Sequence, residues 1–222
     1  LQAIVLLQRG APRSSITAGD FSILVNGRQW TGYGNAGGGF FRPACLSKVE
    51  VPNVVRVQGA LATRGARPLD FKPLRDDGSA VVSMVQDWWV AGTADDAHSA
   101  PKIEHPGNLG VTAVRSIAVD FSGRSGSPLL MVVADRIEAP ADRPVWLQMN
   151  VPNTQGANRG RLQLEGNAFL LRETGKRHES APMVCLAGSF FGPPNVAVEN
   201  RADAIEVADS ARLPAHFRGA PE

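Results

Sequence analysis

Residues 111–137 read VTAVRSIAVDFSGRSGSPLLMVVADRI, two apolar runs on either side of a stretch rich in Gly and Ser. Each run has the length of a β-strand, and the residues between them favour turns. A third apolar run, Val145–Val151, follows after another group of Pro and Asp residues. Strand-like runs recur on both sides, and none has the pattern of a long amphipathic helix. The sequence therefore predicts an all-β chain folded as an antiparallel β-sandwich.

The expected strands are short apolar or alternating runs bounded by Gly, Pro, Asn or Asp. They are residues 3–8, 21–25, 28–30, 49–58, 80–90, 111–121, 129–137, 145–151, 161–164, 168–173, 183–186 and 204–207. Asn26-Gly27 predicts a β-hairpin, because both residues tolerate the positive φ of a type I′ turn. We expect a polar, turn-rich connection at residues 64–77 and a long loop at residues 94–110.

The length of the chain, 222 residues, allows one large β-domain or two small ones. At this size folding buries roughly 70% of the surface of the unfolded chain. We expect residues 1–200 to form a β-sandwich domain and residues 201–222 to add a C-terminal strand and tail. Hydrophobic residues make up 43% of the chain and charged residues 20%, as in an ordinary globular protein.

Charge and hydropathy exclude two classes of protein. The net charge of +2 comes from 23 basic and 21 acidic residues that are interspersed, without a Lys/Arg-rich tract, so we expect no nucleic-acid partner. No stretch of 18 apolar residues exists, so we expect no membrane span. Leu1–Leu7 is too short for a signal peptide, and Leu1 in place of Met leads us to expect a processed product or a piece of a longer protein.

Cys45 and Cys185 are the only cysteines. Two cysteines exclude a disulfide-framework miniprotein and a multi-cysteine zinc site. They could form one disulfide in an exported protein or stay reduced in the cytosol, and the sequence leaves both open.

His98 and His105 lie in the expected long loop, near Asp95, Asp96 and Glu104. A metal site needs three or four convergent ligands, and the spacing of two histidines in a loop sets no geometry. A solvated polar loop is the interpretation we adopt, so we expect no metal site and no cofactor.

The order of segments from Ile16 to Leu171, about two thirds of the chain, resembles the β-sandwich domain of heparinase II/III-like polysaccharide lyases. The motifs that carry the resemblance are DFSILVNGR at residues 20–28, GYG at 32–34, VRSI at 114–117, VVADRI at 132–137, WLQMN at 146–150 and GNAF at 166–169. They resemble the family's first strand and hairpin, its glycine loop, its Arg-rich strand, its Asp-x-Ile/Val strand, its Trp strand and a later hairpin. The resemblance implies a supersandwich-like fold.

The chain departs from the family where chemistry would take place. Many members carry a His-x-His-x-Asp stretch before the first strand, but residues 13–17 read RSSIT here. Ala113 stands where a second family histidine often lies. The resemblance therefore implies a secreted or periplasmic domain that is not catalytic alone. It would pack against an α/α-toroid domain of the same protein and form one wall of a cleft for an acidic polysaccharide.

Lyase chemistry on uronic-acid polysaccharides removes the proton α to a carboxylate and expels the 4-O-linked sugar. It needs a base, an acid and a group that neutralises the developing enediolate. Tyr33 is the only tyrosine and could be the acid, although a lone tyrosine in a hairpin more often packs across strands. His98 and His105 are the remaining weak catalytic candidates.

The candidate sugar contacts are Trp88, Trp89, Tyr33 and Arg115. Aromatic faces suit the apolar faces of sugars, and arginine suits their carboxylates. In an extended strand Trp88 and Trp89 point to opposite faces, so one is expected in the core.

Arg115 and Arg136 could bind acidic sugars, or Asp135 could pair with either arginine and hold strands together, which is the interpretation we favour. Two alternatives to a lyase domain stay open. One is a stand-alone carbohydrate- or protein-binding sandwich, and the other is a structural or assembly protein such as a surface or virion component.

Overall fold

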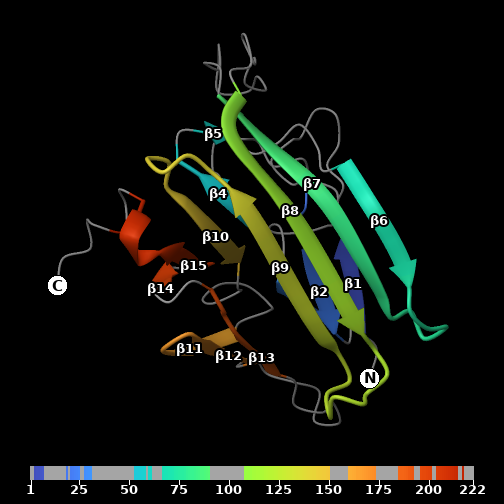
Figure 1. The fold of residues 1–222 in the computed structure, drawn as a ribbon. Helices are drawn as coiled ribbons and strands as arrows, with labels where there is room; N and C mark the ends of the chain where they lie inside the picture. The colour runs from blue at the N-terminus through green and yellow to red at the C-terminus, as the bar shows by residue number, and fades with distance from the viewer. Residues whose placement is uncertain are drawn as a thin grey trace, which may run out of the picture.

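The structure, a computed structural model, describes residues 3–7, 19, 21–25, 28–31, 53–58, 60–61, 67–90, 108–150, 160–173, 185–192, 196–201, 204–214 and 217. These residues form β-strands almost throughout, with a short 3₁₀ helix, η2 (Ser210–Arg212), near the C-terminal end. Within the described ranges the strands build four antiparallel sheets (Figure 1). The all-β prediction is confirmed.

The largest sheet, here called the front sheet, has five strands (Figure 1). They are β5 (Ala60–Leu61), β6 (Arg67–Pro73), β7 (Ala80–Val90), β8 (Asn108–Asp120) and β9 (Leu130–Glu138). The order is β5-β7-β8-β9, and β6 pairs with the same strand as β5. The two apolar runs of residues 111–137 thus belong to β8 and β9, which are neighbours in one sheet.

Three smaller sheets make up a second layer, here called the back layer. The first contains β1 (Ala3–Leu7), β2 (Phe21–Val25) and β3 (Arg28–Thr31) in that order. The second has the order β14 (Val196–Arg201), β15 (Ala204–Asp209), β10 (Val145–Asn150) and β4 (Val54–Val57). The third contains β11 (Gly160–Glu165), β12 (Ala168–Glu173) and β13 (Cys185–Ser189).

One hydrophobic core joins the front sheet to all three sheets of the back layer. Its buried members are Met84, Ile117 and Val119 from the front sheet and Phe21, Ile23, Met149, Phe169, Leu171 and Ile205 from the back layer. A second cluster joins Val111 and Ala113 of β8 to Val55 and Val57 of β4. Two layers that share a core in this way form a β-sandwich.

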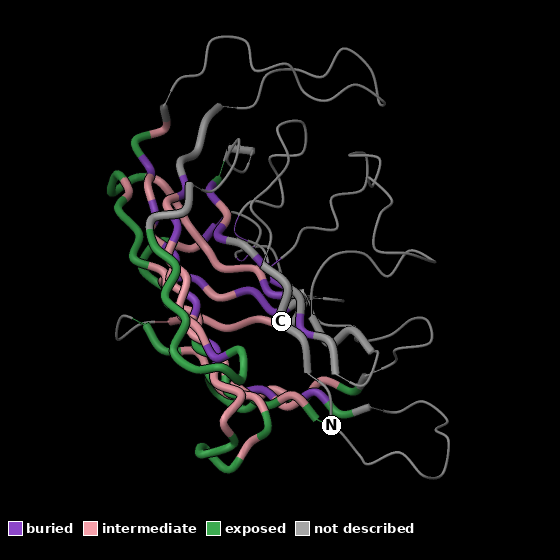
Figure 2. The backbone as a smooth tube through the Cα atoms, turned by 90° about the vertical axis from the view of Figure 1, so that its right-hand side faces the viewer, coloured by how far each residue is buried: buried purple, intermediate pink, exposed green. Residues whose placement is uncertain are grey.

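The alternation of side chains along β8 explains how this strand contributes to the core. Along it the buried residues, Val111, Ala113, Arg115, Ile117 and Val119, alternate with half-buried ones. Figure 2 shows buried and half-buried positions following one another along part of the chain, while other stretches are exposed. Successive side chains of a strand point to opposite faces, so every second residue of β8 enters the core.

The predicted hairpin at Asn26-Gly27 is confirmed. Val25 of β2 pairs with Arg28 of β3, which leaves these two residues as the whole connection. A second two-residue connection, Gly166-Asn167, joins β11 to β12, and Gly166 has a φ of +58°. Residues of this kind accept the positive φ that a tight hairpin turn requires.

The expectation of a turn-rich connection at residues 64–77 was wrong over part of its length, because Arg67–Pro73 forms β6. Pro68 and Pro73 made a strand unlikely from the sequence. Within the described chain β6 pairs only with β7, so it is an edge strand, where a proline costs no ladder hydrogen bond if its nitrogen faces outward.

Strand β14 was not predicted, and it changes the place of the C-terminal strand. The strand expected at residues 204–207 extends to Asp209 as β15, and it lies between β14 and β10. Ile205 and Ala208 of β15 are buried. The C-terminal strand is thus an interior strand of the sandwich.

Leu171 provides a test of the core. It is fully buried, whereas Leu130 at the start of β9 is 45% exposed. We expect Leu171→Ala to lower the free energy of unfolding by about 2–5 kcal/mol, because the substitution leaves a cavity in packed surroundings. Leu130→Ala serves as the matched control and should cost less than about 1 kcal/mol. Urea unfolding of both variants measures the difference, and equal effects would contradict the shared core.

Candidate functional site

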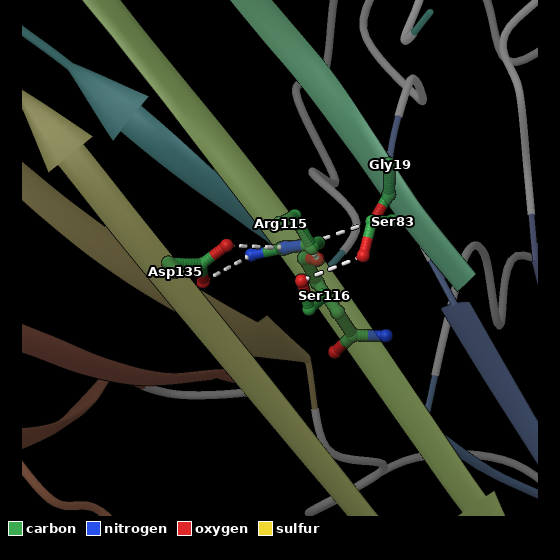
Figure 3. A network of polar contacts seen from close by, with 6 residues as sticks. Gly19, Ser83, Arg115, Ser116 and Asp135 are labelled. Carbon is green, nitrogen blue, oxygen red and sulfur yellow. Dashed lines mark hydrogen bonds and ion pairs between the residues drawn. The ribbon is translucent and has the colours of Figure 1, made fainter. Parts of the chain in front are cut away.

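Arg115 lies at the centre of a buried polar network in the front sheet (Figure 3). Its Nε and Nη2 donate to the two carboxylate oxygens of Asp135, at 2.7 and 2.8 Å. The two residues stand opposite each other in β8 and β9. The side chain of Arg115 is 0% exposed and that of Asp135 is 12% exposed. This is a bidentate ion pair shielded from water, the strongest form of arginine–carboxylate contact.

The third nitrogen of the guanidinium group, Nη1, reaches the back layer. Nη1 of Arg115 donates to the carbonyl oxygens of Gly19 and Asn53, at 2.8 and 2.6 Å. These residues precede β2 and β4. Asn53 is itself fully buried, and its Nδ2 donates to the carbonyl oxygen of Phe21 at 2.6 Å. The side chain of Arg115 therefore links β8 and β9 of the front sheet to the residues just before β2 and β4 of the back layer.

Gly19 is needed where it stands. Its φ is +82°, a conformation that residues with a Cβ rarely adopt. A Cβ at this position would also collide with the side-chain amide of Gln86, which is buried in β7. The close approach brings the carbonyl of Gly19 within reach of Arg115.

The geometry corrects the proposed role of Arg115 as a sugar contact. Its side chain is buried, and two carboxylate and two carbonyl oxygens take up its hydrogen bonds. The alternative, in which Asp135 pairs with an arginine and holds strands together, is the arrangement found. Arg136 points to solvent instead, with its side chain 81% exposed and its Nη2 donating to Glu138 Oε1 at 2.9 Å.

On the other face of the front sheet, the hydroxyl groups of Ser83 and Ser116 lie 2.8 Å apart, and either can be the donor (Figure 3). They are direct partners across β7 and β8. Neither hydroxyl contacts a histidine or a carboxylate among the described residues. The pair links the two strands, as cross-strand hydroxyl pairs do.

Ser79 holds two carboxylates at one end of the front sheet. Its backbone nitrogen donates to Asp77 Oδ1 at 2.9 Å, and its hydroxyl donates to Asp120 Oδ1 at 3.4 Å. Hydrogen bonds from Ser79 hold the pKa of Asp77 below its usual range, and hydrogen bonds chiefly from Ser122 do the same for Asp120. Both carboxyl groups are ionised at neutral pH and are poor general acids there.

Arg56 is a half-buried arginine that the sequence did not single out, and it lies between Val55 and Val57 of β4, on the face turned away from the core. Its Nε donates to Gln148 Oε1 on β10 at 3.3 Å. Burial lowers the pKa of Arg56 from its ordinary value, and the charge of Glu206 acts in the opposite direction. The guanidinium stays charged, since the ordinary pKa of arginine lies so far above neutrality.

Several residues singled out in the sequence lie outside the described part of the chain. They are Tyr33, His98, His105 and the side chains of Trp88 and Trp89, whose backbone belongs to β7. Among the described residues, no group of three or more His, Cys, Asp or Glu is arranged to hold a metal ion. No helix in the same part of the chain has the length and hydropathy to cross a membrane.

A row of exposed residues on the third back-layer sheet was missed. Arg161 of β11 pairs with Arg172 of β12, which pairs with Cys185 of β13. The signal was present in the Gly166-Asn167 turn, because a two-residue hairpin loop sets the register of the strands on both sides. Reading that register would have placed the two arginines opposite each other.

No protein-family model, curated protein or solved structure matches this chain.

The role of Asp135 can be measured through stability. We expect Asp135→Asn to lower the free energy of unfolding by about 3–5 kcal/mol, because Arg115 would keep a buried charge without its counter-ion. Glu138→Gln breaks the exposed pair with Arg136 on the same strand and should cost no more than about 1 kcal/mol. Chemical unfolding of the two variants gives the comparison. Similar losses would show that the burial of the Arg115 pair has no energetic weight.

Ser79 should affect stability in acid. Because the pKa values of Asp77 and Asp120 are lowered on folding, their contribution is present above the ordinary carboxyl pKa and is lost as the pH falls through the folded values. Ser79→Ala removes the hydroxyl but keeps the backbone N–H that Asp77 accepts. We expect it to raise the pKa of Asp120 and, in part, that of Asp77, because the hydroxyl lowers both, and so to weaken this acid-side loss. NMR titration of the Asp carboxyl carbons measures the pKa values. If the pKa values of Asp77 and Asp120 both stayed unchanged, the role given to the Ser79 hydroxyl would be wrong.

Proposed function

We propose that this chain is the β-sandwich domain of a polysaccharide lyase of the heparinase II/III-like kind. In this proposal the domain is not catalytic alone and contributes one wall of a cleft for an acidic, uronate-containing polysaccharide. The α/α-toroid domain that carries the cleft's other wall would be its partner in the same protein. Such polysaccharides lie outside the cytoplasm, so the domain would act in the periplasm or after secretion.

The observation that supports this function is the ion pair between Arg115 and Asp135. These residues come from two separate motifs of the resemblance, the Arg-rich strand at 114–117 and the Asp-x-Ile strand at 132–137. In the structure the arginine of one motif binds the carboxylate of the other at 2.7 Å. This ion pair gives a physical reason for the two motifs to occur together. A pattern of alternating apolar residues alone would give no such reason.

The absence of catalysis in the isolated domain is supported by residues at the family's catalytic positions. Residues 13–17 contain no histidine. Ala113, at the position of a second histidine, is 1% exposed and packs against Val55 and Val57. A methyl group inside the sandwich offers neither a base nor an acid to a substrate.

A structural or assembly role is the second candidate, and the surface of β9 favours it. Leu130, Val132 and Ile137 of this strand are 45%, 53% and 38% exposed. Within the described chain β9 is the last strand of the front sheet. An exposed edge strand with large apolar side chains is suited to pairing with another chain.

One experiment separates these functions. The purified chain is incubated with alginate, heparan sulfate, chondroitin and hyaluronan, and with a neutral glucan as control. Ultraviolet absorbance detects unsaturated uronate, calorimetry detects binding, and light scattering gives the molar mass. We expect saturable binding to at least one acidic polysaccharide, no unsaturated product, and no binding to the glucan.

Product formation would show that the chain is catalytic alone and would contradict that part of the proposal. Absence of binding to every acidic polysaccharide would contradict the carbohydrate function. If the chain then forms a defined oligomer, the assembly role is the one supported.

A further inference from the structure

The exposed face of the sheet β11-β12-β13 carries two arginines directly opposite each other. The register of the hairpin pairs Arg161 with Arg172, and that of the next strand pairs Arg172 with Cys185. All three residues are exposed. Opposed residues of antiparallel strands point to the same face, with Cβ atoms about 4.5–5.5 Å apart. The two guanidinium groups therefore project side by side into solvent.

The scaffold under this row is well packed. The other face of the same strands enters the core through Phe169 and Leu171, which are buried, and through the partly buried Leu162, Leu164 and Leu186. At the end of the hairpin, Asn167 holds the neighbouring strand, since its Nδ2 donates to the carbonyl oxygen of Phe190 at 2.7 Å. The positions of the two arginine Cα atoms are thus set by strand pairing on both sides of β12.

The charge of this pair is not compensated within the described chain. The ion pairs there join Arg115 to Asp135 and Arg136 to Glu138, and none includes Arg161 or Arg172. Glu165 on the same strand stands four residues from Arg161, about 13 Å along an extended strand. Like charges placed directly opposite each other weaken a pair of strands. An anion bound between the guanidinium groups would remove this repulsion.

The chemistry of the row indicates the kind of anion. A guanidinium group offers planar pairs of N–H donors that match carboxylate and sulfate oxygens. The adjoining row of the same face contains Gln163, Leu170 and Ala187, one opposite the next. An amide can bond a sugar hydroxyl, and the apolar side chains can contact the C–H face of a sugar ring.

We propose that Arg161 and Arg172 form a subsite that binds a carboxylate or sulfate group of an acidic polysaccharide, with the sugar ring over Leu170. The inference that the two arginines form an anion site rests on the geometry alone. The polysaccharide as the source of the anion rests on the function proposed above.

Cys185 provides a local reporter for this site. Its thiol is free and exposed, and the residue is the direct partner of Arg172. A ligand seated on Arg172 covers the neighbouring thiol and slows its reaction with a neutral alkylating reagent. Mass spectrometry of the peptide that contains Cys185 reads this rate separately from that of Cys45.

The test uses Arg161→Gln, Arg172→Gln and the double variant. Arg136→Gln is the matched control, because it removes the same charge from an exposed position on the front sheet. The probes are heparan sulfate, which carries sulfate and carboxylate groups, alginate, which carries carboxylates only, and inorganic sulfate. Calorimetry gives the affinity for each polysaccharide, and alkylation of Cys185 is followed with and without every probe.

We expect each single variant to lose about tenfold in affinity, the loss typical of one charge-assisted contact. The control should stay within about twofold of the unsubstituted chain, since a distant surface charge acts only through screened attraction. The polysaccharide should slow alkylation of Cys185 in the unsubstituted chain but not in the double variant. The double variant should unfold at the same temperature as the unsubstituted chain or higher, because the opposed charges are gone. Preference for heparan sulfate over alginate identifies sulfate as the preferred group.

The outcomes separate the subsite from the proposed function. Polysaccharide binding that the double variant retains, with alkylation of Cys185 unaffected, overturns the subsite and leaves the function standing. Protection of Cys185 by inorganic sulfate without any polysaccharide binding supports the anion site and overturns its polysaccharide ligand. Absence of both effects overturns both proposals.

Discussion

The buried guanidinium group of Arg115 is the contact on which the arrangement of the layers depends. Taking a charged pair out of water costs several kcal/mol per ion, and the cost is offset only when the geometry is good and the other donors are satisfied. Here Asp135 accepts two hydrogen bonds, and the carbonyls of Gly19 and Asn53 accept two more. These four hydrogen bonds can form together only when β8, β9 and the residues just before β2 and β4 are correctly positioned.

Hydrophobic burial alone would not impose that positioning, because it has no direction. A shift of β9 by one residue would turn Asp135 to the outer face of the front sheet and leave Arg115 without its counter-ion. The same shift would move Met131 and Val133, which pack against the core, toward solvent. The ion pair and the apolar alternation thus favour the same register, because a shift of β9 by one residue would lose both.

Because Arg115 is buried and hydrogen-bonded, it is not available to a ligand. Among the described residues, Arg161 and Arg172 are charged groups on an exposed sheet face. The positions of such side chains follow from strand register, so a small change in one hairpin turn would separate them.

Apolar alternation and turn residues were enough to predict β7 and β12 at their observed bounds and β8 and β9 to within a few residues, because these signals are local. They missed β6, because its two prolines argue against a strand unless the strand lies at the edge of a sheet. They also did not show that Arg115 is buried. The all-β class, the main strands and the hairpin turns follow from local signals in the sequence. The choice of strands that share a sheet, of the arginine that enters the core and of the arginines that meet on the surface came from the folded chain, because each depends on contacts between residues far apart in the sequence.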